Sequence, residues 1–328
     1  MEKPKVRISV RNLVEFILRS GDLDNSRGSS GDKEAMLKGG RLHRKIQRSM
    51  KGNYQAEVSL KRESEYEDVI IQVEGRADGI FTEDGEFWID EIKGTYGNLQ
   101  AMEVPVPVHR AQAMCYGWIY GEKEGLSQIG IQMTYSHLDT EDTRRFREIF
   151  SMEELKNWYQ KLLDDYHKWI SCSLSWKKER NASMKDLQFP FPYREGQREI
   201  VSGVYHTVSS KKTLFVQAPT GVGKTMSAIF PSVRAIGEGK GETLFYLTAK
   251  TITGTVAWEA FHTLRENGLK FKVTAITAKE KLCFLDSPEC TPEKCPYAKG
   301  HFDRVNDAVY ELWTTEEVYS REVIRAHA

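Results

Sequence analysis

Residues 75–94 read Gly-Arg-Ala-Asp-Gly-Ile-Phe-Thr-Glu-Asp-Gly-Glu-Phe-Trp-Ile-Asp-Glu-Ile-Lys-Gly. Apolar, β-prone residues on both sides of the turn-forming Glu-Asp-Gly predict two strands, Val69–Phe81 and Glu86–Lys93, separated by a turn. Side chains two positions apart in a strand point to the same face of a sheet. Glu91 and Lys93 are therefore expected on one face of the second strand.

Three charged side chains of this stretch suggest a catalytic site. If Asp78 on the first strand faces Glu91, the two carboxylates can share a divalent cation, and Lys93 can orient a water molecule or offset the charge of a phosphate. Metal-assisted hydrolysis of a phosphodiester needs such a set: hard oxygen ligands, an activated water and a cation at the scissile phosphate. The alternative is an exposed hairpin with ordinary charges, because acidic and lysine residues are common.

The surrounding sequence predicts further elements of the same domain. Their signals are helical spacing, or short β-prone runs bounded by turn residues such as Glu63–Glu65. Ser151 is expected to cap a long helix, with Glu153 and Glu154 in its first turn. The other expected helices are Val10–Arg19, Asp32–Met50 and Val106–Tyr120, and the other expected strands are Val58–Lys61, Gln128–His137 and Arg144–Phe150.

Two of these helices carry polar side chains that are unremarkable by themselves. His43 lies in Gly-Gly-Arg-Leu-His-Arg-Lys on the helix before the hairpin. Gln112 and Tyr116, in Gln-Ala-Met-Cys-Tyr, are four residues apart on the later helix and so share one face. Taken alone, His43 is an ordinary surface or core histidine, and the other two are plain helix residues.

The ordered set His43, Asp78, Glu91-x-Lys93 and Gln112-x-x-x-Tyr116 resembles the RecB-type branch of the PD-(D/E)xK nucleases over residues 30–140. The resemblance implies an α-β-β-β-α-β core for this domain. It implies that His43, Asp78 and Glu91 bind Mg²⁺ or Mn²⁺. Lys93 would be the catalytic lysine, and Gln112 and Tyr116 would position the substrate. An alanine precedes Asp78 where the strict family motif has proline.

A second motif, Ala-Pro-Thr-Gly-Val-Gly-Lys-Thr at residues 218–225, predicts a phosphate-binding loop for a nucleoside triphosphate. Thr213–Gln217 before it reads as a buried strand, and Met226–Ile236 after it has helical spacing. The glycines let backbone N–H groups face phosphates, the lysine reaches the terminal phosphates, and the last threonine places a hydroxyl for Mg²⁺. An upstream glutamine after aromatic residues suits adenine recognition. The expected ATP-binding residues are Gln197, Ala218, Pro219, Thr220, Gly221, Val222, Gly223, Lys224 and Thr225.

Residues 242–254 read as a strand that runs into a hydroxyl-rich turn. Such a turn can bind the sugar-phosphate backbone of DNA without reading its sequence, and the alternative is a capped helix start. The candidate DNA-binding residues are Thr248, Lys250, Thr251 and Thr253.

Cys283, Cys290 and Cys295 form a cluster that argues for a metal site, because disulfides are rare in cytoplasmic proteins. An iron–sulfur cubane or a tetrahedral zinc site needs four ligands, so we expect the fourth beyond Ala328. The spacing leaves zinc open, and three unligated thiols are the alternative.

Together the features of residues 189–328 resemble the first motor domain of XPD/DinG-like superfamily 2 DNA helicases. The resemblance implies that Gln197 senses adenine, that residues 218–225 and 248–253 are helicase motifs I and Ia, and that the cysteines begin a [4Fe-4S] insertion. It implies a DNA repair helicase–nuclease that unwinds DNA from 5′ to 3′. The partner would be single-stranded DNA or a junction with a single-stranded tail. No Asp-Glu-x-His motif follows the phosphate-binding loop, so we expect an N-terminal fragment that does not unwind DNA by itself.

The chain is accordingly expected to be an α/β protein of three parts: a nuclease domain at 1–185, a partial RecA-like P-loop domain at 189–281 and a truncated iron–sulfur insertion at 282–328. Other function classes remain open. A PD-(D/E)xK fold without cutting activity would be a DNA-binding adaptor for the motor. A small-molecule kinase or transporter ATPase would share only the phosphate-binding loop. Protein partners cannot be inferred.

Charge and hydropathy set the remaining expectations. The chain has 47 Lys and Arg and 47 Asp and Glu residues, so no global excess of positive charge points to nucleic acid. The first fifty residues are basic and the next fifty acidic, which suits a phosphate-binding face beside a metal site or, equally, an ordinary solvated surface. We expect no membrane span and no signal peptide, and therefore a cytoplasmic location.

Overall fold

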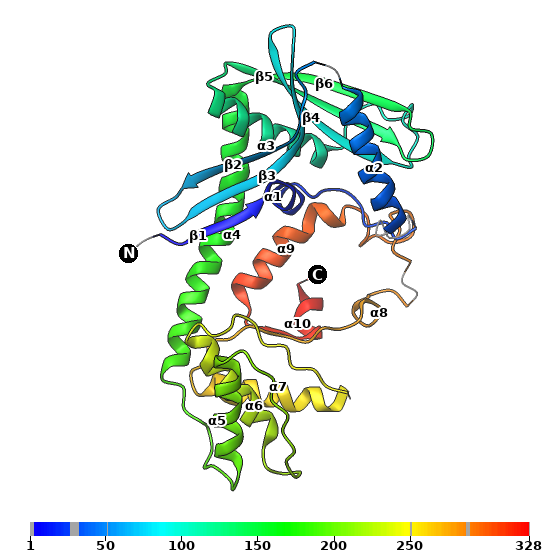
Figure 1. Ribbon diagram of the computed structural model, residues 1–328. Helices are drawn as coiled ribbons and strands as arrows, with labels where there is room; N and C mark the ends of the chain where they lie inside the picture. Colours follow the sequence, from blue (N-terminus) through cyan, green and yellow to red (C-terminus); the bar gives the residue numbers. More distant parts are fainter. Residues whose placement is uncertain (1–2, 27–32, 51, 250, 287–288, 328) are drawn as a thin grey trace. The chain divides into compact units, whose positions relative to one another are not determined.

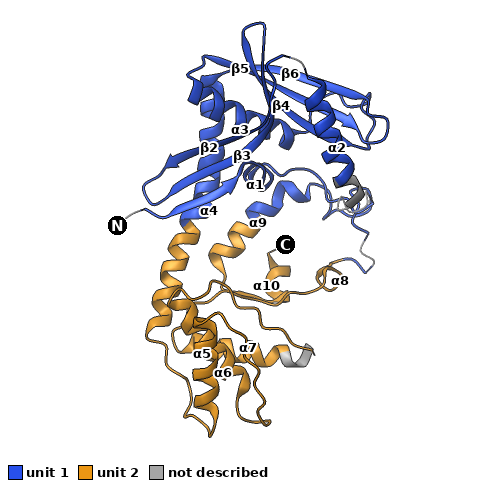
Figure 2. Cartoon of the chain, viewed as in Figure 1, with its two compact units in different colours: residues 1–171, 285–307 blue, residues 172–284, 308–328 orange. Residues whose placement is uncertain are grey.

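The computed structural model describes residues 3–26, 33–50, 52–249, 251–286 and 289–327 (Figure 1). The protein is a mixed α/β chain that divides into two compact units (Figure 2). Unit 1 comprises residues 1–171 and 285–307, and unit 2 comprises residues 172–284 and 308–328. Within the described ranges, no helix combines the length and the apolarity needed to cross a bilayer.

Unit 1 is built on a mixed sheet of six strands (Figure 1). Five strands lie in the order β1-β3-β4-β5-β6, and β2 also pairs with β3. The β1–β3 and β4–β5 pairs are parallel, whereas β2–β3, β3–β4 and β5–β6 are antiparallel. The strands are β1 (Lys5–Ser9), β2 (Gln55–Glu65), β3 (Ile70–Glu83), β4 (Glu86–Thr95), β5 (Gln128–His137) and β6 (Thr143–Ser151).

Helices α2 and α3 contact opposite faces of β4. Ile92 packs with Leu42 and Ile46 of α2, whereas its neighbour Lys93 bonds to Gln112 of α3. This division follows from the alternation of side chains along a strand. The helices of unit 1 are α1 (Val10–Ile17), α2 (Lys33–Ser49), α3 (Pro107–Glu124), residues 152–171 of α4 (Met152–Lys185) and residues 301–307 of α9 (His301–Thr315).

The helices and strands predicted for the first domain are all present, with shifted ends. Strand β5 has the predicted bounds. Ser151 caps α4 as predicted, because its hydroxyl accepts from the Glu154 N–H while the Glu154 carboxylate accepts from the Ser151 N–H. Residues 63–65 were predicted as a turn, and this is wrong: they continue β2, paired with residues 70–72 of β3. Strand β1 was not predicted, because its partner lies more than sixty residues away in the sequence.

The loop after α1 is hydrogen-bonded to the cysteine-bearing segment 290–306, within unit 1. The backbone N–H groups of Leu23 and Asn25 donate to the carbonyls of Ala298 and Cys290, both at 2.9 Å. The Gly21 N–H donates to Asp303 Oδ1 at 2.8 Å, although the two residues are 282 positions apart. The late segment therefore completes the unit formed by the early residues.

Unit 2 is mainly helical. Its buried core joins the end of α4 to α6 and α7 through residues such as Met184, Ile229, Val233 and Leu264. A short parallel pair of strands, β7 with β8, lies in the same unit. The elements are residues 172–185 of α4, α5 (Gln197–Ser209), α6 (Lys224–Gly237), α7 (Thr251–Glu266), β7 (Val273–Thr274), α8 (Lys279–Leu282), residues 308–315 of α9, β8 (Val318–Tyr319) and α10 (Arg321–Ala326).

Two strands predicted around the phosphate-binding loop are absent from unit 2. Residues 213–217 and 242–249 have no regular secondary structure. Their apolar side chains are exposed, with 92% of Phe215 and 89% of Leu247 accessible to solvent. A strand of a parallel sheet needs hydrogen-bonding partners on neighbouring strands, and the described residues supply none at these positions. The predicted helix after the loop is confirmed as α6.

Candidate functional site

The candidate site lies where β3 and β4 separate. The two strands pair from Glu83–Glu86 to Gly79–Asp90, and the pairing ends there. Asp78 comes next on β3, and its Oδ2 accepts a hydrogen bond from the Ile92 backbone N–H at 2.8 Å. The Ile92 N–H no longer has a partner on β3, because the strand pairing has ended. The Asp78 carboxylate accepts its hydrogen bond instead. We call this point of separation, at Asp78 of β3 and residues 91–93 of β4, the fork. The hydrogen bond to Ile92 holds Asp78 beside the end of β4.

Glu91 and Lys93 form a linked pair on β4, as the side-chain alternation predicted. Lys93 Nζ lies 2.7 Å from Glu91 Oε1 and 2.9 Å from Gln112 Oε1 of α3. Glu91 is buried, with 4% of its surface exposed. Its second oxygen, Oε2, is also buried and has no hydrogen-bond partner within the part of the chain that is described. A buried carboxylate oxygen without a partner is costly, and a cation would satisfy it.

The electrostatics of Glu91 reflect its burial. Loss of hydration raises the pKa of Glu91 to about 7; the ammonium of Lys93 opposes this shift and the charge of Asp78 adds to it. The pKa of this carboxyl group therefore lies far above that of an exposed glutamate. Perturbed carboxyl groups with a specific cationic partner are concentrated at functional sites.

His43 reaches the same place from α2. Its Nδ1 lies 3.6 Å from Asp78 Oδ1. Burial by itself lowers the pKa of His43, but the hydrogen bond and the negative charge of Asp78 outweigh it, so the pKa is raised. The structure therefore brings His43 next to Asp78.

Tyr116 approaches β3 closely because residue 75 is glycine. A Cβ atom at Gly75 would lie 2.7 Å from the Tyr116 hydroxyl oxygen, so a larger residue would displace the ring. The charges of Glu91 and Asp78 both act on the Tyr116 hydroxyl, after burial as the largest cause of its raised pKa. Tyr116 and Gln112 thus lie on the face of α3 that meets the fork. No pattern in the sequence indicated the role of Gly75.

The described residues contain no set of three His, Cys, Asp or Glu side chains gathered closely enough to hold a metal ion. Five of the six predicted residues are linked in pairs instead: His43 with Asp78, Glu91 with Lys93, and Lys93 with Gln112. The donor chemistry is nevertheless that of a hard divalent cation, with two carboxylates and an imidazole. The orphaned Glu91 Oε2 is the atom that fits such an ion best.

The opposite face of β4 holds a buried polar network that the sequence did not reveal. Asp90 is fully buried and accepts hydrogen bonds from Tyr54, Gln132 and Thr134 at 2.6–3.0 Å. Burial raises the pKa of Asp90, and these three donors oppose the shift. Because both carboxylate oxygens of Asp90 accept hydrogen bonds from neighbouring side chains, we assign Asp90 a structural role.

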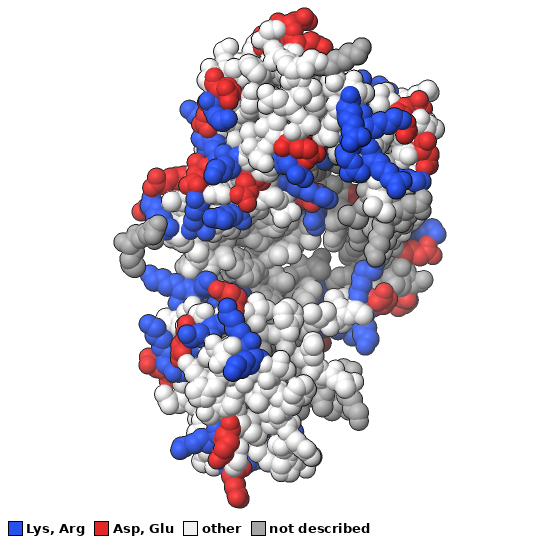
Figure 3. Space-filling model, viewed as in Figure 1, with Lys and Arg blue, Asp and Glu red and all other residues white. Residues whose placement is uncertain are grey.

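Helix α2 presents a basic face to solvent. Arg41, Arg44 and Arg48 are exposed and follow helical spacing along one side. Figure 3 shows Lys and Arg side chains gathered over α2. Lys45 on the same helix is paired with Glu141. The arginines therefore place positive charge on the solvent-exposed side of the helix that carries His43, where it can attract a phosphate backbone.

The phosphate-binding loop of unit 2 has the backbone that its sequence predicted. Gly221 and Gly223 have φ angles of 88° and 76°, which favour glycine, and α6 begins directly afterwards at Lys224. Lys224 Nζ donates to the carbonyls of Ala218 and Pro219, at 3.0 and 2.8 Å. The lysine is thus folded over its own loop, within which its ammonium group is positioned.

Two predicted ATP contacts are engaged with protein groups. Gln197 is buried, its Oε1 accepts from the Arg194 N–H at 3.0 Å, and its amide nitrogen packs against Gly223. The Thr225 hydroxyl accepts from the Tyr246 hydroxyl at 3.3 Å. Gln197 therefore contacts the loop itself.

The predicted DNA-binding turn is only partly described. Thr248 is exposed, and α7 begins at Thr251. Lys250 lies outside the described residues, as do the side chains of Thr251 and Thr253.

The three clustered cysteines are divided between the units. Cys283 follows α8 in unit 2, whereas Cys290 and the buried Cys295 belong to unit 1. The iron–sulfur assignment therefore stays a prediction from the sequence.

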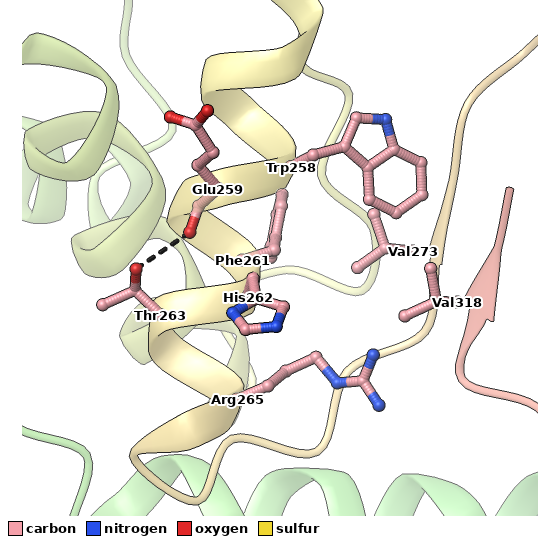
Figure 4. A pocket seen from close by; sticks show the side chains of 8 residues that line it. All are labelled: Trp258, Glu259, Phe261, His262, Thr263, Arg265, Val273 and Val318. Carbon is pink, nitrogen blue, oxygen red and sulfur yellow. Dashed lines mark hydrogen bonds between the residues drawn. The ribbon is translucent and has the colours of Figure 1, made fainter.

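A pocket of about 420 Å³ lies on α7 of unit 2 (Figure 4). The side chains of Trp258, His262 and Arg265 face it from the helix, and Val273 and Val318 close the other side. None of its lining residues belongs to a site predicted from the sequence. The pocket therefore shares no residue with the predicted phosphate-binding loop.

Comparisons with known proteins give partial matches. No family model matches the chain. A stretch of 47 residues is 40% identical to a probable ATP-dependent helicase of Methanocaldococcus jannaschii, and it covers 14% of this chain and 7% of that protein. The crystal structure of SSO0001 is similar over 50% of this chain and 78% of that chain, with 20% identity and a TM-score of 0.32. The match to the helicase supports a helicase relationship over a small part of the chain.

Proposed function

We propose that unit 1 is a metal-dependent deoxyribonuclease and that the chain belongs to an ATP-dependent DNA helicase–nuclease of DNA repair. The observation that carries the nuclease proposal is the fork between β3 and β4. There, a buried and partly unpartnered Glu91 lies beside Lys93, with Asp78 and His43 at the neighbouring position. The proposed substrate is DNA with a single-stranded region, which rests on the sequence resemblance.

Each side chain of the fork has a distinct part in this proposal. Asp78, Glu91 and His43 hold Mg²⁺ or Mn²⁺, which supplies an activated water and offsets charge at the scissile phosphate. Lys93 is held by Glu91 and Gln112 at 2.7 and 2.9 Å, so its ammonium group is fixed before substrate binds. A fixed cation stabilises the charge that develops on a phosphate without reorganising at the moment of reaction. The arginines of α2 bind the flanking backbone.

Unit 2 would supply nucleotide binding. The positive φ angles of Gly221 and Gly223 and the start of α6 at Lys224 support ATP binding at residues 218–225. The short match to a probable ATP-dependent helicase points the same way. Unwinding from 5′ to 3′ and a [4Fe-4S] cluster at the cysteines belong to the whole helicase–nuclease, and we propose them on the sequence resemblance alone.

The nuclease proposal is tested by cleavage of single-stranded DNA in the presence of Mn²⁺. We expect Lys93→Met and Glu91→Gln each to lower the cleavage rate by about 100-fold or more, because each removes a group of the fork. Lys61→Met is the matched control, since Lys61 is an exposed lysine on β2 of the same sheet. The control should cleave at the rate of the unaltered chain.

The same variants distinguish cleavage of DNA from binding of DNA without cleavage. Binding of the oligonucleotide is measured for all variants in the presence of a chelator. If the unaltered chain and its variants bind alike and none cleaves, unit 1 is a DNA-binding adaptor and the nuclease proposal is wrong. If Lys93→Met cleaves as fast as Lys61→Met, the fork is not the catalytic site.

A further inference from the structure

The first turn of α3 is held by a tyrosine that no sequence motif singled out. Tyr135 of β5 is almost fully buried, and its hydroxyl oxygen lies 2.9 Å from the Val106 backbone nitrogen and 3.1 Å from His109 Nδ1. Val106 precedes α3 and makes no side-chain capping bond to the helix. The Tyr135 hydroxyl therefore fixes the position where the helix begins.

The hydrogen bonds of Tyr135 bear on which ring nitrogen of His109 carries the hydrogen. The Tyr135 oxygen accepts from the Val106 N–H, so its own hydrogen is available to His109 Nδ1. With the Tyr135 hydrogen directed at His109, Nδ1 is the acceptor and the neutral ring carries its hydrogen on Nε2. Within the described residues, Nε2 has no hydrogen-bond partner, and the side chain of His109 is partly exposed. His109 therefore has a free donor.

His109 faces the candidate site. It precedes Gln112 by three positions on α3, so the two side chains share a face of the helix, and Gln112 contacts Lys93. Tyr135 is the residue directly opposite Lys93 in the parallel pairing of β4 and β5. After burial, the charge of Lys93 is the next cause that lowers the pKa of His109, to about 4. The imidazole thus stays neutral at physiological pH and lies within electrostatic range of the ammonium group.

We propose that His109 binds a phosphate oxygen of the DNA backbone through Nε2–H beside Lys93, and that Tyr135 is the positioning residue that orients it. A neutral donor suits a site that already holds one ammonium group, because it adds a hydrogen bond without like-charge repulsion. The inference rests on the proposed nuclease function and names a further substrate contact of that site.

The first test follows cleavage of single-stranded DNA with Mn²⁺. We expect His109→Ala to lower kcat/KM by about 10- to 100-fold, which is less than the loss of an oxyanion-hole donor because the proposed contact is to the backbone. His109→Gln retains an N–H donor and should recover part of this loss. Tyr135→Phe should lower kcat/KM by about 10-fold. The control substitutions His167→Gln and Tyr159→Phe lie outside the fork. They should leave kcat/KM unchanged.

The second test does not need cleavage. Histidine is isotope-labelled in the full chain, and its ring signals are followed by NMR with a chelator present. We expect His109 to show the Nε2–H form, and Tyr135→Phe to convert it to a mixture of both neutral forms. A short single-stranded DNA oligonucleotide should shift the His109 signal and not the His167 signal.

The outcomes separate the inference from the nuclease proposal. If the unaltered chain does not cleave but DNA shifts His109 selectively, the nuclease proposal fails and the phosphate contact stands. If the chain cleaves and His109→Ala cleaves equally well, the contact is wrong. It is also wrong if DNA leaves the His109 signal unchanged.

Discussion

The carboxylate of Asp78 accepts a hydrogen bond from the backbone N–H of Ile92, with 2.8 Å between Oδ2 and the nitrogen. Asp78 therefore has a structural part as well as its proposed catalytic one, and two substitutions separate them. Asp78→Asn keeps an oxygen acceptor for Ile92, whereas Asp78→Ala leaves that N–H unpaired. We expect both to abolish cleavage, and Asp78→Ala to be less stable than Asp78→Asn by about 1–2 kcal/mol. Urea unfolding measures the difference; equal stabilities would show that the hydrogen bond is unimportant.

Two buried tyrosines of unit 1 should respond oppositely to loss of the hydroxyl group. The Tyr159 hydroxyl is buried without a hydrogen-bond partner in the described ranges, whereas that of Tyr135 has two. We expect Tyr159→Phe to leave the free energy of unfolding unchanged or to raise it by about 1 kcal/mol. Tyr135→Phe should lower it by about 1–2 kcal/mol. Denaturant titrations of both variants provide the comparison, and a large loss in Tyr159→Phe would contradict the assignment.

His109 should make unit 1 sensitive to mild acid. Burial first, and then the charge of Lys93, lowers its pKa in the folded chain to about 4, with smaller effects from Glu15, which raises it, and Arg11, which lowers it. An unfolded histidine has a pKa of about 6.5. The unfolded state therefore binds more protons between these values, and stability is lost as the pH falls through this window.

The expected loss is about 2 kcal/mol between about pH 7 and pH 5. His109→Gln removes the titrating group, so its free energy of unfolding should depend less steeply on pH over this range. Urea unfolding at several pH values measures both slopes, with His167→Gln as the control. Parallel slopes for His109→Gln and the unaltered chain would show that His109 is not the group responsible.

The basic face of α2 should contribute to DNA binding through charge rather than sequence. Replacing Arg41, Arg44 and Arg48 by glutamine should weaken binding of single-stranded DNA. The slope of log K against log salt concentration should fall by about 2, because three phosphate contacts are lost. Fluorescence anisotropy at several salt concentrations measures this slope. A triple variant with Lys123→Gln, Lys156→Gln and Lys161→Gln removes equal charge from exposed positions elsewhere in unit 1 and should leave it unchanged.

Local patterns were sufficient for most elements of unit 1. Alternation along residues 86–93 predicted that Glu91 and Lys93 share a face, and the Ser151 cap was evident from the first turn that follows it. Pairing between distant residues was not predictable in this way. Three features depend on such pairing: strand β1, the contact of Tyr135 with His109, and the network around Asp90. In each, nothing in one segment indicates that it contacts the other.

In unit 2 the sequence correctly predicted the glycine loop at residues 218–225 and the helix after it. The two strands predicted beside the loop are absent from the described residues. Glycines at positions 221 and 223 and the helical spacing that follows are local properties, and both are confirmed. An apolar run such as Thr213–Gln217 favours a strand only when neighbouring strands can pair with it. Among the described residues this condition is not met, so Phe215 is exposed where burial was expected.

The bond between Gly21 and Asp303 has a consequence for synthesis on the ribosome. All six strands of the unit 1 sheet leave the exit tunnel long before residue 303, yet the loop after α1 can acquire its partners only when the segment around residues 298–303 has emerged. In the nascent chain, this loop of unit 1 therefore lacks its hydrogen-bond partners while the helices of unit 2 are translated. Completion of the amino-terminal half is thus timed by the translation of much later codons.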